Sequence, residues 1–127
     1  MEFISKAKNP NICENGIKIS IGHFKKGSVV KEKANFLFLE HVAQIISERG
    51  YIQIAIDGDR MYFKDTSQSI GFKLVGRESG NRYCYITDKR IINYVREHEG
   101  DYEVKFDEKY KLYFIEPPKL QGWIYRV

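Results

Sequence analysis

The hydrophobic pattern changes along the chain between the period of a strand and the period of a helix. Residues 17–21 alternate apolar and polar side chains, which predicts a half-buried strand. Residues 35–49 carry apolar side chains at intervals of three and four, which predicts a helix with one apolar face. A less apolar helix is predicted over residues 88–99, with the Thr87 hydroxyl as its N-terminal cap.

Further strands are predicted between and after these helices. Residues 51–56 are rich in strand-forming side chains, and an Asp-Gly-Asp turn at residues 57–59 connects them to a return strand at residues 62–63. Residues 69–74 and 83–86 also show strand patterns. Together these elements predict an α+β domain with mostly antiparallel sheet and two helices.

One pattern occurs twice, about fifty residues apart. A glycine after a predicted helix is followed by a tyrosine, a strand, an acidic turn and a return strand, in residues 50–63 and again in residues 100–114. In each copy an apolar dipeptide begins ten residues after the tyrosine, which is Tyr51 or Tyr102. Because duplicated units commonly pack about a pseudo-twofold axis, we predict two pseudo-symmetric strand-helix-hairpin units.

Length and composition fit one domain that spans residues 1–127. A chain of this size buries roughly two-thirds of the surface that its unfolded form exposes, which is enough for a core without metals or disulfides. We divide the chain into a loose N-terminal arm (1–15), a first unit (17–65), a second unit (66–116) and a C-terminal aromatic tail (117–127).

Cysteine usage and hydropathy indicate the setting. Cys13 and Cys84 lie in unlike contexts and suggest no disulfide framework, which is typical of a reducing, cytoplasmic environment. No stretch reaches eighteen consecutive apolar residues, so we expect no membrane span. The formal net charge is +4, and residues 1–33 carry seven Lys/Arg against three acids. A basic region of this kind attracts polyanions over roughly 8–10 Å in physiological salt, although solvated surface lysines would give the same count.

Catalytic motifs are not recognisable in the sequence. His23, His41 and His98 are isolated and show no metal-ligand spacing, and neither a nucleophile elbow nor a phosphate-binding glycine loop is present. The carboxylates at residues 57–59 and 107–108 fall in predicted turns, where polar residues are needed for the turn itself. We therefore expect a binding protein without enzymatic activity, cofactor or metal.

The strongest functional signal is a basic segment with alternating tyrosines. Arginine offers a planar fork for phosphates and tyrosine a face for stacking bases, so this mixture suits a nucleic acid or a small nucleotide. The predicted binding residues are Lys73, Arg77, Arg82, Tyr83, Tyr85, Lys89 and Arg90, and a second set of phosphate contacts is Lys25, Lys26, Lys31 and Lys33. Strand tyrosines also serve as half-buried core residues, and residues 123–125 either close the core or anchor a partner protein.

The repeat resembles the unit of the swapped-hairpin regulators of the AbrB and MazE type, which are bacterial DNA-binding proteins. The best match is residues 100–117, and residues 50–64 form the weaker copy. The proline that follows the first strand in those regulators has no counterpart here. The resemblance implies DNA binding by basic residues at the strand-to-helix junctions, namely Lys25, Lys26, Lys31 and Lys33 in one unit and Arg82, Lys89 and Arg90 in the other.

These observations favour a nucleic-acid-binding module, with DNA as its ligand. The small, basic and tyrosine-rich character also resembles accessory proteins of phages and mobile elements. The alternative is therefore an inhibitor that binds a host defence protein, or that sequesters a small signalling nucleotide near Arg77, Arg82 and Tyr83. A homodimer is compatible with both hypotheses.

Overall fold

The computed structural model describes residues 15–76 and 78–117. They form ten strands and two helices, and the strands pair antiparallel throughout in two five-stranded sheets. The predicted α+β class with mostly antiparallel sheet is therefore confirmed. Cys13, Arg77, the predicted arm before residue 15 and the tail after Pro117 lie outside the described residues. Neither helix of the described chain has the length and apolar character needed to span a bilayer.

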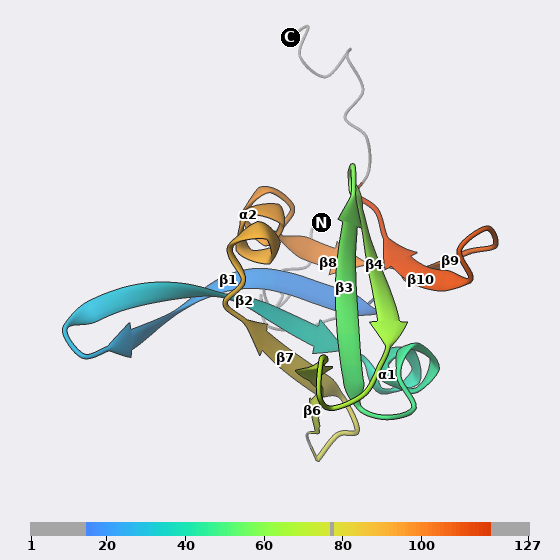
Figure 1. Cartoon of the computed structure of the whole chain (residues 1–127), viewed down its shortest axis with the longest axis horizontal. Helices are drawn as coiled ribbons and strands as arrows, with labels where there is room; N and C mark the ends of the chain where they lie inside the picture. The colour runs from blue at the N-terminus through green and yellow to red at the C-terminus, as the bar shows by residue number, and fades with distance from the viewer. Residues whose placement is uncertain (1–14, 77, 118–127) are drawn as a thin grey trace, which may run out of the picture.

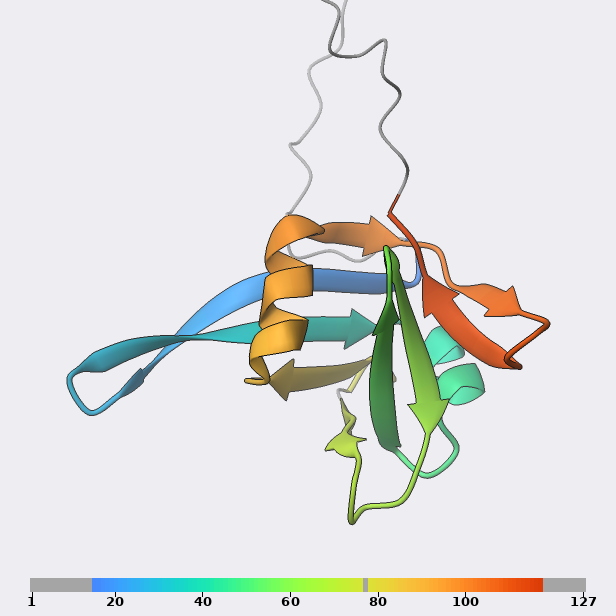
Figure 2. The same cartoon turned by 45° about the horizontal axis from the view of Figure 1, so that its top comes forward.

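Sheet A has the strand order β6-β7-β2-β1-β8 (Figure 1). Its strands are β1 (Ile17–Lys26), β2 (Val29–Phe38), β6 (Val75–Gly76), β7 (Arg82–Ile86) and β8 (Gly100–Tyr102). β1 and β2 pair along their full length, but β8 reaches β1 only at residues 17–19 and β7 reaches β2 only at residues 34–38. Residues 22–33 therefore project from the sheet as a two-stranded ribbon, which both views show (Figures 1 and 2).

Sheet B has the strand order β5-β3-β4-β10-β9. Its strands are β3 (Tyr51–Asp57), β4 (Arg60–Asp65), β5 (Phe72–Lys73), β9 (Lys105–Asp107) and β10 (Leu112–Ile115), and the helices are α1 (Glu40–Ile46) and α2 (Lys89–Glu97). In both views α2 and the β3–β4 hairpin lie on the same side of sheet A (Figure 2). That side is the inner face of sheet A, and its opposite is the outer face.

The core lies between the inner face of sheet A, sheet B and α2. Alternate residues of the two long strands are buried there, namely Ile17, Ile19, Ala34, Phe36 and Phe38. Phe63 of β4 packs edge-on against Phe36 and Phe38, with ring centroids 6.4 and 5.7 Å apart. This aromatic group joins the two sheets, and the intervening residues of β1 and β2 are left to form the outer face.

The predicted helix over residues 35–49 is wrong in its first part. β2 continues to Phe38, and α1 occupies only Glu40–Ile46. The buried side chains of β2 alternate, with Phe36 and Phe38 both at most 1% exposed, as a strand requires. Ile45, which the helical pattern placed on the apolar face, is 51% exposed.

The second predicted helix is confirmed with shorter bounds and a different cap. α2 begins at Lys89, and the Asp88 carboxylate accepts hydrogen bonds from the backbone N–H groups of Arg90 and Ile91 at 2.9 and 3.4 Å. The predicted cap, Thr87, lies one residue too early to reach these amides. Asp88 therefore satisfies the unpaired amides of the first turn.

The two hairpins of the predicted repeat share their register. Ile56 pairs with Met61 in β3–β4, and Asp107 pairs with Leu112 in β9–β10, so equivalent positions are 51 residues apart. The preceding tyrosines lie in different sheets, because Tyr51 begins β3 in sheet B whereas Tyr102 ends β8 in sheet A. The two-unit symmetry as a whole is not confirmed and stays a prediction.

Candidate functional site

The outer face of sheet A gathers lysines and tyrosines from three strands. Strand pairing places Lys18 beside Leu37 and Tyr83 in one row, and the next row contains Ser20, Asn35 and Tyr85. Alternate residues of a strand point to the same face, so the lysines of the ribbon continue this surface. We call it the tyrosine–lysine face and define it as Lys18, Ser20, Phe24, Lys26, Lys31, Lys33, Asn35, Leu37, Tyr83 and Tyr85.

A hollow of about 300 Å³ opens on this face. Its lining consists of Lys18, Ser20, Asn35, Phe36, Leu37, Tyr83 and Tyr85. The Tyr83 and Tyr85 rings are neighbours, with centroids 4.9 Å apart and planes inclined at 47°. Tyr85 is 50% exposed, and the Lys33 Nζ atom lies 3.9 Å from its ring centroid. This is a cation–π contact at the rim of the hollow.

Asn35 lines the hollow and carries a buried hydrogen-bond acceptor without a partner in the described chain. Its Oδ1 atom is buried and has no hydrogen-bond partner among the described residues. Gly22 of β1 makes room for the side chain, since a Cβ atom there would lie 2.4 Å from Asn35 Nδ2. Leaving a buried acceptor unpaired costs about 1–3 kcal/mol, and a rotation of the side chain that lets Oδ1 meet a donor would recover that energy.

The charges on the tyrosine–lysine face are almost all positive. Lys18, Lys26, Lys31 and Lys33 form no ion pair within the described chain. The ribbon's own carboxylate, Glu32, points to the other side of the hairpin and forms an ion pair with Arg96 of α2. Among the described residues, the carboxylate in register with this face is Asp101, whose backbone lies opposite that of Lys18 in the pairing of β1 with β8.

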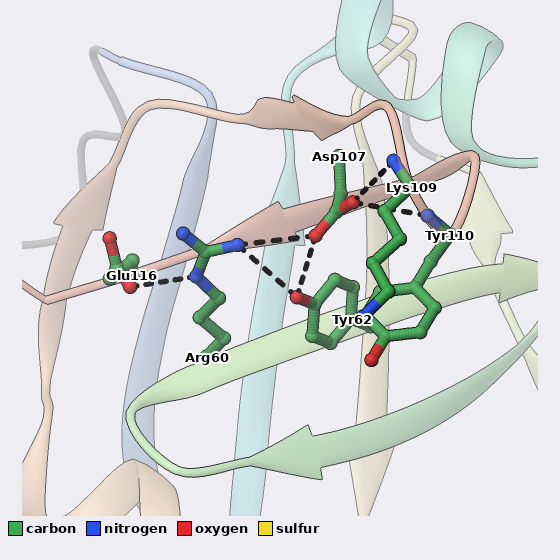
Figure 3. Close-up of polar contacts among 6 residues, drawn as sticks. All are labelled: Arg60, Tyr62, Asp107, Lys109, Tyr110 and Glu116. Carbon is green, nitrogen blue, oxygen red and sulfur yellow. Dashed lines mark hydrogen bonds and ion pairs between the residues drawn. The ribbon is translucent and has the colours of Figure 1, made fainter.

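On the face of sheet B that points away from the core, Arg60 is paired with two carboxylates (Figure 3). Arg60 Nε lies 2.8 Å from Glu116 Oε2, and its Nη1 lies 3.2 Å from Asp107 Oδ2. The Tyr62 hydroxyl donates to the same Asp107 oxygen at 2.9 Å. The pKa of Asp107 is lowered, first by the backbone N–H of Tyr110, and that of Arg60 is raised, first by Glu116. This network fastens the β9–β10 hairpin to β4, and we interpret it as structural.

The structure brings together part of the predicted binding residues. Lys26, Lys31, Lys33, Tyr83 and Tyr85 share the tyrosine–lysine face. Lys25 points to the opposite side of the ribbon, beside Val30 in the register, and Lys73 belongs to β5 in sheet B. All four predicted ribbon lysines lie in a hairpin and not at a strand-to-helix junction, because β2 continues beyond them to Phe38.

The remaining predicted residues lie elsewhere. Arg82 and Tyr83 are consecutive on β7 but line different hollows. Tyr83 lines the hollow of the tyrosine–lysine face, whereas Arg82 lines another one together with Glu40 and Gly80. Lys89 begins α2, where Arg90 Nη2 pairs with Asp88 Oδ2 at 3.1 Å. Arg82 and Tyr83 therefore face different hollows, and Arg77, the third residue of the predicted nucleotide pocket, lies outside the described residues.

Lys18, Ser20, Asn35 and Leu37 were missed by the sequence-based prediction. The alternation of Lys18 and Ser20 with Ile17 and Ile19 was a signal that both face away from the core. Asn35 had no such signal, because its segment was assigned to a helix.

Across residues 15–76 and 78–117, no group of three His, Cys, Asp or Glu side chains is placed to bind a metal ion.

The chain matches no protein-family model, no curated protein and no solved structure.

Proposed function

We propose that the chain is a non-enzymatic nucleic-acid-binding module whose contact surface is the tyrosine–lysine face. The observation that supports this best is that four lysines, which form no ion pair within the described residues, share one sheet face with two tyrosines and a hollow. Lysines contact phosphates, and release of the condensed counterions favours the complex. Tyrosine rings present apolar faces on which bases stack.

The ribbon extends this surface away from the body of the domain. Lys31 and Lys33 are two residues apart on one side of β2, which spaces their Cα atoms by about 7 Å along the strand. Both features support a polyanion laid along the ribbon and across the sheet, and DNA is the ligand that the sequence resemblance suggests.

The two-unit symmetry belongs to this proposal only in part. The equal register of β3–β4 and β9–β10 supports a duplicated hairpin. The basic residues expected in the second unit, Arg82, Lys89 and Arg90, lie away from the tyrosine–lysine face. We therefore assign binding to one face of sheet A and not to two equivalent surfaces.

Salt dependence and charge reversal test the proposal together. Fluorescence anisotropy with a labelled oligonucleotide should show a 50- to 150-fold loss of affinity, roughly, between 50 and 200 mM salt if about four phosphates are contacted. The double variant Lys31→Glu with Lys33→Glu should abolish binding at 200 mM salt. The matched control, Lys73→Glu with Lys89→Glu, makes the same change of charge away from the face and should retain most of the affinity. Equal losses in both double variants, or no binding at 50 mM salt, would contradict the proposal.

The size of the hollow also favours the second hypothesis, sequestration of a small nucleotide. A volume of about 300 Å³ lies at the lower end of ligand-binding pockets. Thermal shift against a panel of mononucleotides tests it, because a ligand at a hundred times its Kd stabilises the fold by about 2.7 kcal/mol. Stabilisation by a mononucleotide, without oligonucleotide binding, would favour this hypothesis over the first.

A further inference from the structure

We propose that the hollow on the tyrosine–lysine face receives one unpaired base, so that the protein selects single-stranded over double-stranded nucleic acid. This inference rests on the proposed function and adds the form of the ligand. The shared chemistry is that of an unpaired nucleotide, whether within a strand or free in solution.

The dimensions of the hollow favour a single base. Its volume of about 300 Å³ suits a base with its sugar, and it opens between Lys18 on one strand and the two tyrosines of β7. Bases in a duplex are stacked on both sides and turn only their edges to the grooves. Reaching the floor of the hollow therefore requires a base that has left the stack, as in single-stranded loops and ends.

Lys33 and Tyr85 form the part of the site that would respond to the base. The Lys33 ammonium lies over the Tyr85 ring at 3.9 Å from its centroid. A cation–π contact at an exposed site is weaker than the stacking of a base on an aromatic ring. A base that takes this position frees the ammonium to meet the flanking phosphate, so both groups gain a stronger partner.

Asn35 lines the hollow, and its Oδ1 atom is covered by neighbouring atoms, so a base reaches it only after the side chain rotates. Its unpartnered Oδ1 needs a donor, and the exocyclic amino groups of cytosine and adenine are donors, whereas uracil and thymine carry a carbonyl oxygen at the corresponding position. Cytosine and uracil have similar ring sizes, so they differ mainly at this edge. We therefore infer that the hollow prefers cytosine to uracil.

Stacking is tested with single-stranded and duplex 12-mers in anisotropy titrations at fixed salt. The wild-type protein should bind the single strand at least fivefold more tightly than the duplex. Tyr85→Leu should weaken single-strand binding by about 5- to 100-fold, while Tyr85→Phe, which keeps the ring, should retain it. An affinity for duplex equal to that for single strand, or an unchanged single-strand affinity in Tyr85→Leu, would overturn the inference.

The base preference gives a second readout. Wild-type protein should bind oligo-deoxycytidine about 2- to 10-fold more tightly than oligo-deoxyuridine, the range expected for one hydrogen bond. Asn35→Leu should reduce this ratio to one, with circular dichroism to check that the variant is folded. A wild-type ratio of one, which needs no variant to measure, or an unchanged ratio in folded Asn35→Leu, would remove Asn35 from the site.

The outcomes separate this inference from the proposed function. If the Lys31 and Lys33 charge reversals abolish binding but Tyr85→Leu has no effect, the nucleic-acid surface stands and the base-binding hollow falls. If no oligonucleotide binds at 50 mM salt, the proposed function itself fails. Thermal shift with cytidine monophosphate then distinguishes a free nucleotide from a strand, because stabilisation by the monophosphate would show that the hollow acts alone.

Discussion

Truncation of Phe63 should show how strongly one aromatic contact holds the two sheets together. Phe63 is 1% exposed and carries both edge-on contacts between sheet B and the pair Phe36 and Phe38 of sheet A. Phe63→Ala removes the ring and leaves a cavity between two layers that are each hydrogen-bonded internally. Because such layers cannot collapse freely into the space, we expect the loss to be near the upper limit for this substitution.

The magnitude follows from the burial and the two ring contacts. A buried Phe→Ala substitution costs about 3–5 kcal/mol, and edge-to-face pairs contribute about 0.5–1.5 kcal/mol each beyond burial. We therefore expect Phe63→Ala to lower the free energy of unfolding by about 4–5 kcal/mol, a large part of the roughly 5–15 kcal/mol typical of one domain. Phe63→Leu, which refills most of the volume, should cost about 1–2 kcal/mol.

Urea titration followed by far-ultraviolet circular dichroism measures these differences, provided that the slope with denaturant is unchanged. Ile70→Ala is the control, because Ile70 is 61% exposed and its loss should cost less than about 0.5 kcal/mol. A double-mutant cycle with Phe38→Leu should give a coupling of about 0.5–1.5 kcal/mol. A cost below about 1.5 kcal/mol for Phe63→Ala, or additivity in the cycle, would refute the role given to this contact.

Three further predictions concern the helix cap, acid stability and the buried thiol. Asp88→Ala should lower the free energy of unfolding by about 1 kcal/mol, because α2 loses its N-terminal cap. Asp88→Asn, whose side chain can still cap the helix, should retain most of the stability in thermal melts. Equal losses of stability in the two variants would exclude capping. Burial raises the pKa of Asp65, but hydrogen bonds led by that of Ser47 outweigh burial and leave it below its ordinary value. The folded state therefore gains stability from the Asp65 carboxylate above a pH of about 4 and loses it as the pH falls through the folded pKa. Asp65→Asn should therefore reduce the fall of the urea midpoint at acid pH, and an unchanged fall would contradict this. Burial raises the pKa of Cys84 to about 12, so in a Cys13→Ser background a thiol reagent at pH 8 should react only after unfolding, whereas rapid reaction of the native protein would show that the thiol is accessible.

Local patterns predicted much of the fold because their causes are local. The Asp-Gly turn between β3 and β4 follows from the positive φ of Gly58, +61°, which glycine adopts without strain. The alternation in β1 follows from one buried face. The segment before α1 misled the prediction, because Phe38 and Val42 have helical spacing although Phe38 ends a strand. A side chain at the junction of a strand and a helix fits the apolar pattern of both elements. Only the strand that pairs with its backbone shows to which element it belongs.

The sequence could predict which residues of the candidate site share a face only where those residues belong to the same strand. Tyr83 and Tyr85 share a side of β7 by alternation, as do Lys31 and Lys33 of β2. What joins these pairs is the contact between β2 and β7, in which Asn35 lies opposite Tyr85, fifty residues away. Such pairing depends on the burial of the whole inner face and not on any local pattern. Arg82 and Tyr83 are neighbours in sequence but not on the surface, because consecutive residues of a strand point to opposite faces of the sheet.

The position of the closing strands in the sequence determines when a nascent chain can fold. β8 borders β1 more than 80 residues after it, and β10 borders β4 about fifty residues after it. A ribosome-bound chain that ends at residue 99 would therefore leave an open backbone edge in each sheet. We expect folding to wait for the last quarter of the sequence and to proceed at the millisecond-to-second rates of proteins with distant strand pairings, a period in which chaperones have access to the chain.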